Sequence, residues 1–230
     1  MGFLTKFFTN VFHENAPALA HNSFEHASPA DLEAHLSVAS YGDFTLTEAI
    51  RPSMDLKVVP QQGFRHDSYQ DEQSKSHVPV LMAAVSSENL FDVFMDLIDP
   101  LGNEVDVVLE SSHDRDQTGR SDCYRECIDV PVLKSMLWDF EEMLTNDGCT
   151  GLAVLNPHVP LEVQFDEHKL LIVYGSDLTP FERVLEDHGI YCQDELRFIT
   201  EAEHVHSSND EYVSQFEQLR NRLGMDGGFC

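Results

Sequence analysis

Residues 78–110 read VPVLMAAVSSENLFDVFMDLIDPLGNEVDVVLE, and this stretch decides the fold class. Its first part, 78–86, is a continuous apolar run that predicts a strand buried on both faces. Ser86 or Ser87 can cap a helix over 88–98, whose apolar residues share one face. A DPLG turn then leads to EVDVVLE (104–110), which predicts a second strand. The order strand, helix, strand indicates a βαβ unit with parallel strands.

The sequence beyond residue 110 continues this alternation. Asp129 and Pro131 predict the start of a helix to about Asn146, and Asn209 predicts the cap of a C-terminal helix. The remaining predicted elements are strands at 150–156, 161–165 and 169–175, a helix over 179–189 and a last strand at 196–200. We therefore expect an α/β (or α+β) fold: a mixed sheet of about six strands with helices packed on it, in the order β-α-β-α-β-β-β-α-β-α from residue 78.

Residues 1–77 are predicted to be an N-terminal extension of a domain formed by residues 78–230. Ser28, followed by Pro29, predicts a short helix that ends near Ser40, and residues 55–59 are a possible strand. Residues 61–77 are polar and nearly free of aliphatic side chains, which predicts a long loop or linker.

The first twelve residues carry an apolar stripe at helical spacing. Its members are Phe3, Leu4, Phe7, Phe8, Val11 and Phe12. The favoured interpretation is that this stripe packs on the main domain or on a second copy of the chain. The alternative is a partner protein whose groove binds it.

The charge balance limits the classes of partner. Asp and Glu total 41 against 14 Lys and Arg, which gives a formal net charge of −27. Such a chain repels nucleic acid and anionic membrane surfaces, since binding to either needs clustered Lys and Arg. The acidity could serve a basic partner or a cation ligand, but its scattered distribution favours general solvation of the surface.

Cysteine usage and hydropathy predict a cytoplasmic protein. Five cysteines at irregular spacing do not form the framework of a disulfide-rich secreted domain. No apolar run reaches the roughly 18 residues of a transmembrane helix, and the N-terminus lacks the pattern of a signal peptide.

Two stretches combine histidines with carboxylates after predicted strands. In ESSHDRDQTGRSDCYREC (110–127), His113 and Asp116 are the plausible ligand pair for a divalent metal ion. Cys123 and Cys127 in the same stretch have no second cysteine pair with which to build a zinc knuckle. The favoured interpretation of this stretch is a solvated connecting loop.

The second stretch is EAEHVHSSNDE (201–211). His204 and His206 would face the same way on an extended chain, which suits a metal site. If 196–200 lay parallel to 104–110, all four residues His113, Asp116, His204 and His206 could share one ion. Surface histidines in a histidine-rich chain are the favoured alternative.

Two functional hypotheses follow. The favoured one is a non-enzymatic interaction or regulatory protein without a cofactor, acting through residues 3–12 and the acidic surface. The alternative is a metal-dependent, hydrolase-like enzyme that uses the two His/Asp clusters. Motifs for nucleotide binding or for a serine nucleophile are absent from the sequence.

Overall fold

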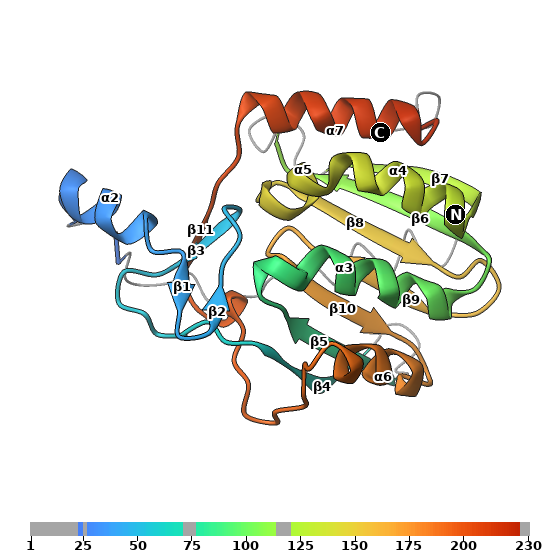
Figure 1. Ribbon diagram of the computed structural model, residues 1–230, viewed down its shortest axis with the longest axis horizontal. Helices are drawn as coiled ribbons and strands as arrows, with labels where there is room; N and C mark the ends of the chain where they lie inside the picture. The colour runs from blue at the N-terminus through green and yellow to red at the C-terminus, as the bar shows by residue number, and fades with distance from the viewer. Residues whose placement is uncertain (1–22, 25–26, 71–76, 114–120, 226–230) are drawn as a thin grey trace.

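The chain has an α/β fold built around one large sheet (Figure 1). This computed structural model describes residues 23–24, 27–70, 77–113 and 121–225. Seven strands form the large sheet in the order β4-β5-β10-β9-β8-β6-β7, and two small sheets have two strands each. The seven strands are β4 (Gly63–Gln70), β5 (His77–Ala84), β6 (Glu104–Ser111), β7 (Ser121–Asp129), β8 (Thr150–Leu155), β9 (Glu162–Phe165) and β10 (Leu170–Tyr174).

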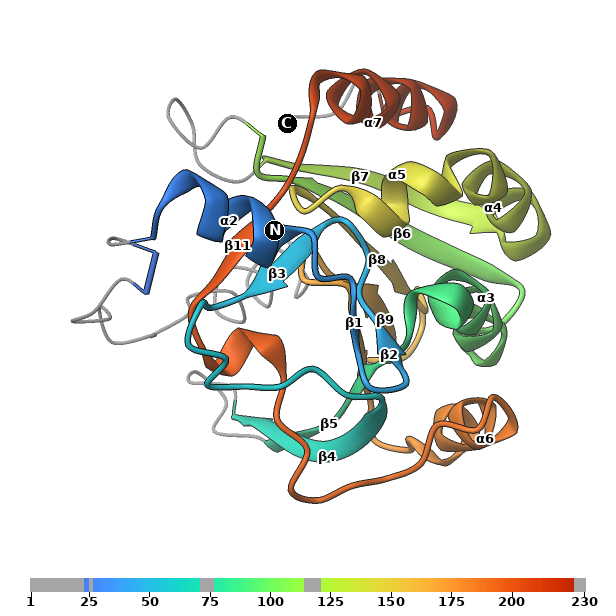
Figure 2. The same cartoon turned by 60° about the vertical axis from the view of Figure 1, so that its left-hand side comes forward.

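Helices cover one face of this sheet and enclose the main core between the two layers (Figures 1 and 2). The helices of this layer are α3 (Ser87–Ile98), α4 (Val130–Leu137), α5 (Glu141–Asn146), α6 (Thr179–Asp187) and α7 (Asp210–Arg222). Short 3-10 turns, η1 (Asp99–Leu101) and η2 (Trp138–Phe140), lie next to α3 and between α4 and α5. A second apolar cluster covers β5 and β10 on the opposite face.

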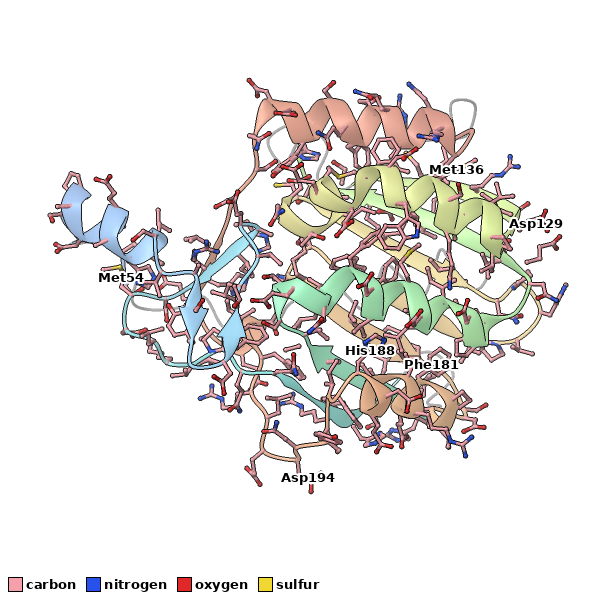
Figure 3. All side chains as sticks on the ribbon, in the orientation of Figure 1. Met54, Asp129, Met136, Phe181, His188 and Asp194 are labelled. Atoms are coloured by element: carbon pink, nitrogen blue, oxygen red, sulfur yellow. The ribbon has the colours of Figure 1, made fainter. Side chains whose placement is uncertain are left out.

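The small sheets lie at one end of the large sheet. One pairs β1 (Ser40–Tyr41) with β2 (Phe44–Thr45), and the other pairs β3 (Ile50–Pro52) with β11 (His204–His206). The helix α2 (Pro29–Leu36) and the turn η3 (Ile199–Glu201) belong to the same part of the chain. Met54 marks this end and Asp129 marks the opposite end of the molecule (Figure 3).

The predicted α/β class is confirmed, with seven strands in the large sheet where about six are expected. The strands near 78–86, 104–110 and 150–156, the 161–175 hairpin and the helices that follow are all present. Two predicted caps are confirmed as well. Ser28 and Asp31 form a capping box, and the Asn209 side chain accepts a hydrogen bond from the Tyr212 N–H.

The predicted parallel pairing of the βαβ unit is wrong. Each ladder of the large sheet is antiparallel. β5 and β6 do run in the same direction, but β10, β9 and β8 lie between them. The α3 crossover therefore spans three strands, and later hairpins fill the space that it leaves.

The two edge strands were predicted to be loops. β4 lies within the predicted linker 61–77, and most of β7 lies within the stretch 110–127 that was interpreted as a connecting loop. Residues 66–68 and 124–127 are exposed. Polar and charged side chains are typical of edge strands, because they discourage pairing with other molecules.

Two predicted strands are absent, and one predicted helix is interrupted. Residues 55–59 contain a turn with Leu56 at a φ of +46°. Residues 196–200 lead into η3, so β11 begins at His204 instead. The helix expected over 130–146 breaks at η2, whose last residue, Phe140, has non-helical backbone angles.

The predicted stripe of Phe3, Leu4, Phe7, Phe8, Val11 and Phe12 lies outside the described residues. The division of the chain at residue 77 stays a prediction, although β4 belongs to the large sheet. Among the described helices, none has the length and apolarity that a membrane crossing requires.

Candidate metal centre

Antiparallel pairing brings four strand ends together at one end of the large sheet. Ser111, the last residue of β6, pairs with Thr150, the first residue of β8. Phe165, at the end of β9, pairs with Leu152 of β8 and with Leu171 of β10. The connections that leave these strands therefore meet at one edge, which faces the small sheets (Figure 1).

The β9–β10 turn holds a histidine at this edge. Asp166 organises the turn, because its Oδ1 accepts hydrogen bonds from the N–H groups of His168 and Leu170. Lys169 closes the turn with a φ of +62°. The imidazole of His168 is thereby buried at the end of the sheet, with 8% of the residue exposed.

The strand β11 brings two further histidines to the same place. His204 and His206 are two residues apart on an extended strand, so their side chains lie on the same side. Gly148 donates its N–H to Ser207 O, and Ser207 donates its N–H to Ala49 O. A Cβ at Gly148 would overlap the Ala49 carbonyl oxygen, so this close approach requires glycine.

His168, His204 and His206 together form the three-histidine cluster. A ring nitrogen of each lies within 4.8 Å of a ring nitrogen of the other two. The ring centroids are 4.8 to 5.1 Å apart. His168 is buried, whereas His204 and His206 are partly exposed, so the cluster has one side open to solvent.

Each imidazole of this cluster donates a hydrogen bond through Nδ1. His168 donates to Asp166 Oδ2 at 2.8 Å, His204 to Ala202 O at 2.8 Å and His206 to Gly148 O at 2.6 Å. A carbonyl or carboxylate oxygen can only accept, so Nδ1 carries the proton in all three rings. In the neutral form, Nε2 is then the nitrogen with the lone pair.

The electrostatics keep these rings suited to bind a cation. Burial lowers the pKa of His206 to about 4, and the neighbouring His168 adds to this effect. Burial alone would raise the pKa of Asp166, but His168 and backbone hydrogen bonds hold it below its usual value. A neutral His206 and an ionised Asp166 are therefore the states near neutral pH.

Two further charged side chains surround the cluster. Ser112 Oγ donates to Glu167 Oε2 at 2.7 Å, which positions this partly buried carboxylate next to His168. Lys169 Nζ donates to Thr150 O at 2.9 Å, and burial lowers its pKa to about 8. Lys169 and His168 also line a small cavity of about 30 Å³, enough for roughly one water molecule.

A second cluster at this edge contains His113, Asp147 and Cys149. His113 Nδ1 lies 2.7 Å from Ser111 Oγ, and Nε2 lies 2.9 Å from Asp147 Oδ2 without the alignment of a hydrogen bond. Burial would raise the pKa of Asp147, but the neighbouring His113 and hydrogen bonds from Ser208 and Thr150 bring it to about 2. This cluster is a buried His–Asp pair in which each nitrogen of the imidazole has a close polar neighbour.

The structure thus brings the predicted residues together in a new grouping. His204 and His206 join His168, whereas His113 joins Asp147 and Cys149. Asp116 lies outside the described residues. The predicted C-x3-C pair is on β7, where Cys123 is buried and Cys127 is exposed.

Sequence reasoning did not identify His168 as a site residue. The DEHK sequence at 166–169 correctly predicts a hairpin turn. Its histidine was interpreted only as part of that turn and not as a possible ligand. A histidine that directly follows two carboxylates in a tight turn was the available signal. Nothing in the sequence predicts the pairing of β11 with β3, which places His204 and His206 next to that turn.

The chain matches no protein-family model, no curated protein and no solved structure. The chemistry of the site therefore rests on its geometry.

Proposed function

We propose that the chain is a metal-dependent hydrolase-like enzyme whose ion is bound by His168, His204 and His206. The observation that carries this proposal is the fixed orientation of the three rings. Histidines that bind metal ions almost always donate their other N–H to a carboxylate or backbone carbonyl, as all three do here. Three imidazoles suit zinc best, with Zn–N distances of about 2.0–2.1 Å after small rotations of the rings.

Three protein ligands leave a fourth coordination position for water. Structural zinc sites are closed by four protein ligands, whereas catalytic sites keep one position open. The partial exposure of His204 and His206 supports an open position on the solvent side. A bound zinc ion would lower the pKa of that water to about 7 and so supply hydroxide at neutral pH.

Glu167 is the candidate general base of this site. Ser112 fixes one of its oxygens, and its charge raises the pKa of the nearby His206. A carboxylate at this place could accept the proton of a metal-bound water. Asp166 has a different role, because it positions His168.

The test is the metal content of the purified, untagged protein. We expect about one zinc per chain in the wild type and almost none in the His204→Ala/His206→Ala variant. The matched control is His77→Ala/His158→Ala, which removes two exposed histidines elsewhere and should retain the metal. Protein that is metal-free, and whose thermal unfolding is unchanged by zinc, manganese or iron, would contradict the proposal.

The catalytic part of the proposal has its own test. Zinc-loaded protein should hydrolyse an activated ester or phosphodiester, and Glu167→Gln should lose most of this turnover, typically a hundredfold or more for a general base. The variant should keep its zinc. Full activity in Glu167→Gln would remove Glu167 from the mechanism while leaving the metal site intact.

We also propose a reducing, cytoplasmic location. The four cysteines in the described part of the chain, Cys123, Cys127, Cys149 and Cys192, are all free thiols. The alternative hypothesis of an interaction protein acting through residues 3–12 stays a prediction.

A further inference from the structure

The large sheet has a second buried surface over β6, β8 and β9, on the face opposite the helix layer (Figure 1). Side chains alternate along β8, so Leu152 and Val154 lie in the main core and Ala153 and Leu155 lie on the other face. Val108 of β6 joins the latter two in a small apolar cluster, whose three members are each exposed by 3% or less. Among the described residues, this cluster has no member outside β6 and β8.

The polar side chains beside this apolar cluster are buried as well. Glu162 and Gln164 of β9 lie on the same face and are 4% and 2% exposed, and the Gln164 amide donates a hydrogen bond to the Glu162 carboxyl group. Burial raises the pKa of Glu162 to about 8. Polar side chains on the outer face of an antiparallel sheet ordinarily contact water. Their burial here means that another segment covers this face.

The covering segment belongs to the same chain, because these side chains are buried within a single copy. The described apolar cluster on this side of the sheet lies over β5 and β10 and includes no residue of β6, β8 or β9. Outside the described ranges, apolar side chains concentrate in residues 1–22. Residues 25–26, 71–76 and 114–120 contain none, and residues 226–230 contain only Phe229 and Cys230.

We propose that the apolar stripe of residues 3–12 packs on this face of the sheet and covers Val108, Ala153 and Leu155. As a helix, these ten residues would be about 15 Å long. Three neighbouring strands measure roughly 10 Å across, so one such helix is long enough to cross them. The stripe is then part of the fold instead of a peptide for a partner's groove. The inference does not depend on metal binding.

The position of Ser23 allows this placement. Ser23 donates its N–H to Glu203 Oε2 at 2.9 Å, directly before β11 at the end of the large sheet where the small sheets lie. Residues 13–22 connect the stripe to Ser23. Ten residues span up to about 33 Å when extended, which is enough to reach the covered face from that end.

The first experiment places photoreactive benzoyl-phenylalanine in the full-length protein, at Phe8 within the stripe and, as a control, at Thr9 on the opposite side of the predicted helix. Peptide mass spectrometry after irradiation locates the cross-linked residues. We expect the probe at Phe8 to cross-link within its own chain to peptides of β6, β8 or β9. The probe at Thr9 should give at least fivefold less of this product.

Two matched double variants test the packing without a probe. Phe7→Ser/Phe8→Ser should lower the melting temperature by about 5 °C or more, because two large apolar side chains lose their buried contacts. Lys6→Ser/Thr9→Ser changes the polar side of the same segment and should shift the melting temperature by less than about 1 °C.

Three outcomes would overturn the inference. The first is a cross-link from Phe8 between two chains, seen as a doubled mass, which would assign the stripe to a second copy. The second is a cross-link within the chain to the helix layer, which would place the stripe on the other side of the sheet. The third is the absence of any cross-link from Phe8, or equal melting temperatures of the two double variants, because the stripe would then be free to bind a partner protein.

Discussion

The two histidine clusters at the end of the sheet have similar compositions and opposite chemistry. In the three-histidine cluster, each ring donates through Nδ1 to an oxygen outside the cluster, which leaves the lone pair on Nε2, and a ring nitrogen of each lies within 4.8 Å of the others. In the cluster of His113, Asp147 and Cys149, the single ring contacts Asp147 through one nitrogen and Ser111 through the other. Hydrogen-bond partners therefore distinguish a candidate metal site from a structural ion pair, where residue types alone do not.

We expect the largest loss of zinc affinity for His168→Gln. This change removes one proposed ligand but keeps a polar side chain of similar volume in the β9–β10 turn. Zinc affinity should fall by more than about a hundredfold, because loss of a ligand exceeds the effect of losing a supporting residue. Zinc titration against a competing chelator measures the effect. Unchanged affinity would show that His204 and His206 bind the ion with other partners.

We expect the second largest loss of zinc affinity for Asp166→Asn. An asparagine in this position can still accept hydrogen bonds from the backbone N–H groups of His168 and Leu170. Its amide nitrogen would then lie where Asp166 Oδ2 accepts the His168 Nδ1–H, and because an amide nitrogen cannot accept that hydrogen bond, zinc affinity should fall about 10- to 100-fold. The same titration measures the change, with thermal unfolding of the metal-free protein as the control. A full loss of folding would point to a structural role for the carboxylate instead.

These two positions also show where sequence reasoning reached its limit. The β9–β10 hairpin is predictable because two apolar runs flank a short polar turn, and β9 and β10 pair accordingly. His204 and His206 stand out by their two-residue spacing. The third histidine is 36 to 38 residues away from them along the chain, and only the pairing of β11 with β3 joins the two parts.

The errors at the edge strands and at residues 196–200 have one physical cause. The spacing of apolar residues along the sequence indicates which side chains are buried. The central strands and the helices bury their side chains at regular intervals. The edge strands β4 and β7 expose polar side chains, so their sequences resemble loops. In contrast, residues 196–200 are apolar because Leu196, Phe198 and Ile199 fill the second apolar cluster without forming a strand.

His113→Gln should change stability and leave metal binding intact. The pKa of Asp147 is about 2 in the folded protein against a usual value of 3.8, which corresponds to about 2 kcal/mol of stability at neutral pH. Because this folded-state pKa is depressed, the contribution is present above about pH 4 and is lost as the pH falls toward 2. Without His113, the pKa of Asp147 rises and part of the contribution disappears.

Urea unfolding at several pH values measures this effect. The wild type should exceed His113→Gln in stability by up to about 2 kcal/mol near pH 7, and the difference should narrow between about pH 5 and pH 3. Zinc content should be equal in the two proteins. A difference in stability that does not depend on pH would mean that His113 contributes through packing on Phe216, with which its ring is in edge contact.

We expect Cys149→Ala to cause the smallest change, both in stability and in zinc content. The backbone of Cys149 donates its N–H to Asp147 Oδ1 and accepts the N–H of Ser112, and both hydrogen bonds survive the loss of the thiol. Stability should change by less than about 1 kcal/mol, since the side chain is only partly buried. Zinc content should match the wild type, because the proposed ion is bound by His168, His204 and His206 and not by this cluster. Loss of zinc in this variant, with full zinc in His168→Gln, would reverse the assignment and place the ion at the buried ion pair, where metal binding would first have to displace His113 from Asp147.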